Sequence, residues 1–307
     1  MDTLTTAFQE IIKQVMILTK SASVITEDNV YQEADSNIHP YMDEMVGSLV
    51  LPGSGVDGLE NLEELFAKAE SGKSCLLLPE HYSNLDLSLF TYLLDRAGGR
   101  GKEISRAIVA IAGMKLNEAN PVVSTFASAY TRIVIYPSRS LEGLDAQKDR
   151  AEIIRSNAIN RAAMKTLTNI KNKGRLVLIF PSGTRYRPGD PSTKRGVREI
   201  DSYIKSFDYM CPVAINGEVL HIRPGNMMDD EVSQDLVRFS AGKILSCAEF
   251  RNKIRAEADA RDAADPDQMP ADKKQAVVDA IMEILEEMHI KGEKAREQFL
   301  KQKITKL

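Results

Sequence analysis

The chain has 307 residues, 43% of them hydrophobic, which is enough for one large core or for a main domain with a smaller helical one. Lys and Arg together number 40 against 44 for Asp and Glu, so the formal net charge is -4. This balance gives no reason to expect a nucleic acid partner.

The N-terminal segment predicts an amphipathic helix over residues 4–20, because apolar side chains recur there at helical spacing. Polar residues interrupt the segment, so it is neither a signal peptide nor a membrane span of about 20 apolar residues. The same apolar pattern returns at residues 59–70. The stretch between them favours a loop, because it contains Pro40, Pro52, Gly53, Gly55 and Gly58.

Short aliphatic runs dominate the middle of the chain, and segments of helix length separate most of them. Near-continuous apolar strands that alternate with helices are typical of a mainly parallel sheet covered on both faces. Ligands of such folds bind beyond the carboxyl ends of the strands. The runs predicted to form strands span residues 74–78, 106–111, 132–136, 175–180 and 211–215.

The chain is predicted to be helical again after about residue 230. Residues 251–274 are charged and rich in alanine, so we expect a surface connection there, followed by an amphipathic helix from Val277 to Met288. The predicted fold is therefore α/β, with a mainly parallel central sheet flanked by helices. A smaller N-terminal helical domain (residues 1–70) precedes the α/β domain with its C-terminal helices (residues 71–307).

Three cysteines, Cys75, Cys211 and Cys247, are widely spaced and lie among apolar residues. The sequence contains no CxxC motif and no Cys/His spacing of a metal site. We therefore expect buried free thiols in a reducing compartment, and no metal.

A histidine follows the first core strand in the sequence PEHYSNLDLSLF, where His81 precedes a predicted helix over residues 85–96. Asp86 lies in the first turn of that helix and can point back to one imidazole nitrogen. This arrangement makes the other nitrogen a general base, as in a His/Asp pair without its serine. The three other histidines lack such a setting, and we expect them to be structural or surface residues.

A second polar segment, FPSGTRYRP, follows the strand at residues 175–180. Pro181 ends the strand, Gly183 permits a tight turn, and Arg185 and Arg187 alternate so that both would face one pocket in an extended segment. Paired guanidinium groups bind phosphate in bidentate fashion. The alternative is a polar turn with two solvated arginines.

Taken in chain order, HYSNLD, the strand end at residues 132–140, FPSGTRYRP and CPVAI resemble the four sequence blocks of the glycerophospholipid acyltransferase family. The resemblance covers roughly residues 74–225. With Ser182 where many members have Glu, FPSGTRYRP is most similar to the soluble, plastid-type glycerol-3-phosphate acyltransferases. Those relatives lack membrane spans and carry a helical N-terminal domain.

The resemblance implies that His81 is the general base and that Asp86 holds its imidazole in the right tautomer. His81 would take the proton from the sn-1 hydroxyl of glycerol 3-phosphate as that hydroxyl attacks an acyl thioester, without a covalent acyl-enzyme. The residues implied to bind the acceptor or to shape its turn are Arg139, Gly183, Thr184, Arg185 and Arg187.

The acyl donor implied by the resemblance is a co-substrate, either acyl-CoA or an acyl carrier protein (acyl-ACP), and no cofactor is expected. The basic residues Lys194, Arg195 and Arg198 suit the acidic carrier protein and the phosphates of coenzyme A equally well. The acyl chain requires an apolar groove, for which Leu87, Phe90, Met114 and Phe126 are candidates. We expect a soluble protein, cytoplasmic or stroma-like, with transient peripheral contact to a membrane.

Two alternatives stay open from the sequence. The first keeps the chemistry but uses a lysophosphatidate acceptor and makes phosphatidate. The second is a catalytically silent module that binds lipid or phosphate, against which the presence of both His81 and Asp86 argues. A hydrolase with a nucleophile elbow is excluded, because the segment Pro181 to Gly183 lacks the first glycine of Gly-x-Ser-x-Gly.

Overall fold

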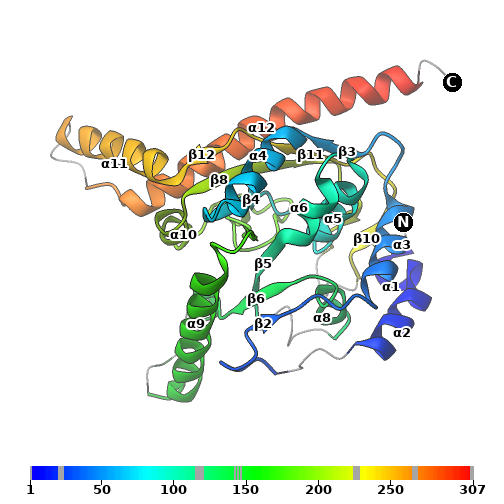
Figure 1. The fold of residues 1–307 in the computed structure, drawn as a ribbon, viewed down its shortest axis with the longest axis horizontal. Coiled ribbons are helices and arrows are strands. Elements are labelled where there is room, and N and C mark those ends of the chain that lie inside the picture. The colour runs from blue at the N-terminus through cyan, green and yellow to red at the C-terminus, as the bar shows by residue number, and fades with distance from the viewer. Residues whose placement is uncertain are drawn as a thin grey trace.

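The structure is a computed structural model that describes residues 2–19, 24–114, 121–141, 143, 145, 147–223, 229–264 and 269–304. Five parallel strands form the centre of its main sheet, in the order β6-β5-β7-β4-β8 (Figure 1). All five lie where the aliphatic runs predicted strands, and the mainly parallel sheet flanked by helices is confirmed. The strands are β4 (Cys75–Pro79), β5 (Ile108–Gly113), β6 (Arg132–Ile135), β7 (Leu176–Leu178) and β8 (Tyr209–Asn216).

Short strands extend this sheet at both edges. β2 (Tyr31–Gln32) pairs antiparallel with β6. At the other edge β11 (Arg238–Ala241) and β12 (Leu245–Ser246) pair antiparallel with β8, and β3 (Gly55–Asp57) lies parallel to β11. A separate antiparallel sheet consists of β1 (Asp2–Thr3), β10 (Glu231–Val232) and β9 (Leu220–His221).

Helices cover both faces of the main sheet, and the strands feed both cores because successive side chains point to opposite faces. In β4, Cys75 and Leu77 pack into one core, whereas Leu76 and Leu78 pack into the other. The first core includes residues of α1 (Leu4–Ala7), α2 (Gln9–Leu18), α3 (His39–Leu49), α4 (Leu59–Glu70), α5 (Asp86–Arg96), α6 (Gly101–Ala107) and α8 (Pro121–Ala127). The second includes residues of α9 (Arg150–Ile170), α10 (Ile200–Ser206), α11 (Cys247–Ala264) and α12 (Lys273–Ile304).

The predicted N-terminal helix is present but breaks at Phe8 into α1 and α2. The loop expected between residues 20 and 59 was wrong in part, because α3 lies there. Pro40 occupies the first turn of α3, where proline starts a helix instead of breaking it. Buried residues of α1 to α4 pack into the same core as residues of the main sheet, and a domain boundary at residue 70 stays a prediction.

The C-terminal region differs from the prediction at residues 251–274. The expected surface connection is largely helical, since α11 runs to Ala264. Its alanine, glutamate and arginine residues are strong helix formers. The prediction gave more weight to the many charged residues of this segment than to their helix propensity. The predicted final helix is confirmed as α12. It extends at both ends beyond the apolar residues from Val277 to Met288 that predicted it. It packs along β8 and β11, and its C-terminal end projects past the neighbouring elements (Figure 1).

The three cysteines are free and buried, as the sequence predicts. Burial raises the pKa of the Cys75, Cys211 and Cys247 thiols to about 12, so none is a thiolate near neutral pH. Among the described residues, no helix combines the length and apolar character needed to cross a membrane.

Candidate active site

His81 and Asp86 form a hydrogen-bonded pair at the carboxyl end of β4. His81 Nδ1 lies 2.9 Å from Asp86 Oδ2, and the Asp86 side chain is 3% exposed. Because α5 begins at Asp86, its carboxylate points back over the loop that carries the histidine. The sequence predicted this geometry from the placement of the histidine before the helix.

Asp86 accepts three further hydrogen bonds within the same loop. Tyr82 N and Ser83 N donate to Oδ2 at 2.6 and 2.9 Å, and Ser83 Oγ donates to Oδ1 at 2.7 Å. A carboxylate surrounded by donors is an acceptor toward His81 as well, so Nδ1 carries the proton and Nε2 has a free lone pair. No described residue forms a hydrogen bond with Nε2.

The segment FPSGTRYRP packs directly against His81. The ring of Phe180 stacks on the imidazole, with centroids 3.9 Å apart and an angle of 15° between the planes. The backbone N–H of Tyr186 donates to the His81 carbonyl oxygen at 2.8 Å. His81 is therefore held by two segments that lie about a hundred residues apart in the chain.

A left-handed turn at Gly183, where φ is +63°, gives this segment its shape. Gly183 N donates to Phe180 O at 3.0 Å, and Ser182 Oγ donates to Thr184 O at 2.7 Å. A Cβ atom at position 183 would lie 3.1 Å from Val197 Cγ1. Glycine is thus required both by the backbone conformation and by the close packing.

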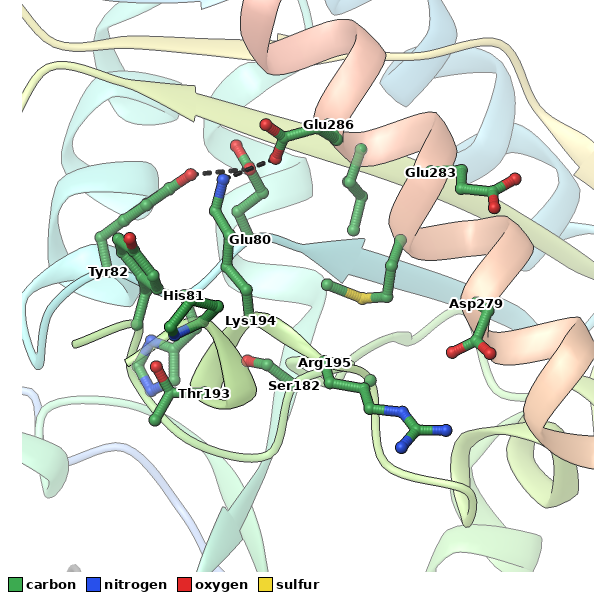
Figure 2. Close-up of a pocket in the computed structure, with 15 residues that line it drawn as sticks. Glu80, His81, Tyr82, Ser182, Thr193, Lys194, Arg195, Asp279, Glu283 and Glu286 are labelled. Carbon is green, nitrogen blue, oxygen red and sulfur yellow. Dashed lines mark hydrogen bonds and ion pairs between the residues drawn. The ribbon is translucent and has the colours of Figure 1, made fainter. Parts of the chain in front are cut away.

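A pocket of about 330 Å³ opens beside His81, between the loops at the strand ends and α12 (Figure 2). Lys194 and Arg195 contribute positive charge to its wall, whereas α12 contributes the three carboxylates of Asp279, Glu283 and Glu286. Glu80, Tyr82, Ser182 and Tyr186 also line it. A concave site with a candidate base and several polar groups is the expected form of an active site.

Lys194 is held across the pocket by Glu286, with 2.5 Å between Nζ and Oε2 (Figure 2). The Glu286 side chain is 48% exposed, so the pair is a surface ion pair, a class that contributes about 0–1 kcal/mol. A charged substrate group can therefore replace Glu286 at low cost.

The arginines predicted to bind phosphate lie elsewhere. Arg185 Nη1 contacts Asp230 Oδ2 at 2.7 Å, and the Asp230 side chain is 1% exposed. Removing one partner of such a buried pair typically costs about 3–5 kcal/mol. Arg187 and Arg139 are exposed. None of these arginines, and neither Gly183 nor Thr184, is among the described residues that line the pocket, and their roles in acceptor binding stay predictions.

A buried carboxylate beside the histidine was missed from the sequence. Glu80 accepts from Ile215 N at 2.8 Å and Tyr82 OH at 2.8 Å, and its Oε2 lies 3.0 Å from His289 Nδ1 of α12. Burial alone lowers the pKa of His289, but its hydrogen bond with Glu80 and the negative charge of Glu80 outweigh this effect and raise the pKa above its usual value. The sequence signal for Glu80 was its position directly after a buried strand, where a carboxylate can belong to a site at the strand end.

A narrow apolar crevice borders Asp86. Leu87, Phe90 and Phe180 line it together with Leu178, Ile215 and Phe239. Leu87 and Phe90 were candidates for an acyl groove, whereas Met114 and Phe126 do not line the crevice. No group of three or more His, Cys, Asp or Glu side chains is arranged to hold a metal ion in the described part of the chain.

Comparison with known families decides the broad class. A family model described as acyltransferase matches residues 54–216, which is more than half of the chain. The chain belongs to the acyltransferase family. An acyltransferase moves an acyl group from a donor, in general a thioester, to an acceptor. The matched span of this acyltransferase contains the His81–Asp86 pair and the turn at Gly183, but it excludes α12. No curated protein matches the chain.

Proposed function

We propose that this acyltransferase transfers a fatty acyl group from an acyl thioester to the sn-1 hydroxyl of glycerol 3-phosphate, with His81 as general base. The observation that carries the proposal is the His81 imidazole, whose Nδ1 bonds to buried Asp86 while Nε2 is left free beside a pocket. That is the arrangement of a base ready to accept a proton from a substrate hydroxyl.

The reaction follows from this geometry. Nε2 of His81 accepts the proton of the acceptor hydroxyl as its oxygen attacks the thioester carbonyl carbon. The tetrahedral intermediate collapses to the ester, and the departing thiolate takes the proton from Nε2. Asp86 stabilises the imidazolium formed in between, and Phe180 holds the plane of the ring.

Direct transfer needs no acyl-enzyme, and the nearby side chains support that route. The hydroxyl of Ser83 donates to Asp86, and the hydroxyl of Ser182 donates to the Thr184 carbonyl. The cysteine thiols are buried with raised pKa values. Neither serine bonds to a described histidine or lysine that would activate it as a nucleophile.

Basic residues near the base favour a phosphorylated acceptor over a neutral one. Lys194 and Arg195 line the pocket beside His81, and we keep Arg139, Arg185 and Arg187 as proposed phosphate contacts, with Gly183 and Thr184 shaping the turn. We propose that the enzyme needs no cofactor or metal and works as a soluble cytoplasmic or stroma-like protein with transient membrane contact.

The acceptor assignment is tested by incubating the purified protein with radiolabelled acyl-CoA or acyl-ACP and, separately, glycerol 3-phosphate, lysophosphatidate or glycerol. We expect 1-acylglycerol 3-phosphate as the main product, and the two donors show which thioester is used. A preference for lysophosphatidate would contradict the proposed acceptor. Transfer to none of the three acceptors would contradict the proposed function as a whole.

A further inference from the structure

The pocket beside His81 does not attract anions in general. Glu80, Asp279, Glu283 and Glu286 outnumber the two basic residues of its lining. Glu80 is engaged by Tyr82, His289 and the backbone of β8, so its charge is largely satisfied. An anion that enters must therefore gain a specific cationic partner, and Lys194 and Arg195 are the cations that line this pocket within the described residues.

Lys194 differs from Arg185 in the kind of carboxylate that holds it. Its ammonium group bonds to a half-exposed carboxylate on the surface of α12, which can turn into water when displaced. Arg185 is held by a carboxylate that is almost fully buried, and that carboxylate also accepts from Arg223 N at 3.0 Å. Exchange of partners is therefore easier at Lys194.

From this contrast we infer that Lys194 binds the phosphate monoester of the acceptor. When no acceptor is bound, the Glu286 carboxylate occupies the place of that phosphate at Lys194 Nζ. The phosphate displaces the Glu286 carboxylate from Nζ, and the displaced side chain turns into solvent. Helix α12, which lies outside the span of the family match, thereby sets the affinity for the acceptor. This inference rests on the proposed function, because it assigns the phosphate of that acceptor to one side chain.

Because Glu286 and the phosphate compete for Lys194, substitutions of Lys194 and Glu286 should change the affinity for glycerol 3-phosphate in opposite directions. Lys194→Met removes the cation, so we expect glycerol 3-phosphate to bind about tenfold more weakly or worse. Glu286→Gln removes the competing charge but keeps the size of the side chain, so we expect binding to tighten by a few-fold or more. If Glu286 instead positioned Lys194 for the substrate, Glu286→Gln would weaken binding.

Isothermal titration calorimetry with glycerol 3-phosphate, inorganic phosphate and coenzyme A separates these cases. Matched controls are Glu287→Gln, an exposed position of α12 that does not line the pocket, and Lys102→Met, an exposed lysine of α6. Both controls should bind glycerol 3-phosphate as the wild type does, and thermal melting confirms that each variant is folded.

Unchanged or tighter binding in Lys194→Met, or unchanged or weaker binding in Glu286→Gln, would overturn the inference. An effect on coenzyme A with none on glycerol 3-phosphate would also overturn it, since the phosphate would then belong to the donor. If the wild type binds glycerol 3-phosphate with the expected pattern but does not acylate it, the proposed function fails while the phosphate site stands. Normal acylation kinetics in Lys194→Met would contradict the phosphate site at Lys194 but would leave the proposed function standing.

Discussion

At the scale of single residues, His81, the proposed general base, is held by the groups that surround it. Asp86 fixes one nitrogen, Phe180 fixes the ring plane, and Tyr186 anchors the carbonyl of the same residue. The sequence predicted the contact between His81 and Asp86, because a carboxylate in the first turn of a helix reaches the loop before it. It could not predict the stacking partner, since that contact joins segments about a hundred residues apart.

The arginine pattern shows where reasoning at this scale stops. Alternation in an extended segment predicts that Arg185 and Arg187 face the same side, and this stays a prediction. The backbone N–H of Tyr186, which lies between the two arginines, donates to the His81 carbonyl oxygen, and the Arg185 side chain pairs with Asp230. The sequence could not predict the contact of Arg185 with Asp230, because 45 residues separate the two in the chain.

Gly183→Ala tests how far this turn supports the site. Alanine in the left-handed region costs about 1–2 kcal/mol, and here its Cβ would also press on Val197. We expect a larger loss of unfolding free energy than in Gly189→Ala, a control with φ +87° and no atom within 4 Å of the added Cβ. Chemical denaturation measures both losses, and equal losses would contradict the packing argument.

At the scale of elements, α12 completes a site that the strand ends begin. It contributes a pocket wall and an ion pair with Lys194 (Figure 2). Its His289 also forms a hydrogen bond with Glu80. Its existence followed from the apolar spacing at Val277, Ile281 and Leu285. Its place over the carboxyl ends of the strands did not, because an amphipathic pattern shows which face is buried but not which strands it covers.

The His289–Glu80 contact between α12 and the end of β4 predicts a pH dependence of stability. Because the pKa of His289 is raised in the folded state, the folded protein binds more protons than the unfolded chain, and stability falls as pH rises through the folded pKa. The contribution is complete below the ordinary histidine pKa of about 6.5 and is lost above it. The charged groups that act on His289 are Glu80, Lys194 and Glu286, and Glu293 bonds to Asn216, which also contacts His289.

His289→Asn places an amide group near the position of Nδ1, so it can keep a hydrogen bond to Glu80 but cannot take up a proton. We expect it to remove a downward slope of at most about 1.4 kcal/mol per pH unit just above pH 6.5, measured by urea denaturation at several pH values. Identical slopes in the variant and the wild type would show that His289 does not carry this linkage.

At the scale of the whole molecule, the residues proposed to be catalytic lie at the carboxyl ends of the parallel strands, and the C-terminal helix α12 covers them. The buried aliphatic runs predicted the sheet because strands covered on both faces need no polar side. Edge strands such as β2 and β12 were not predicted, since two residues are too few to show a period. The acyltransferase match likewise covers His81 and the turn at Gly183, whereas α12, which forms a wall of the pocket, lies beyond it.

The central claim is that His81 is the general base for acyl transfer, and its most direct test is the turnover of His81→Ala with glycerol 3-phosphate. His39→Ala, in α3, is the matched control, and circular dichroism with thermal melting checks the fold of both. We predict a loss of about 10²- to 10⁴-fold in kcat for His81→Ala and wild-type turnover for His39→Ala. Turnover near the wild-type rate in a folded His81→Ala protein would contradict the mechanism.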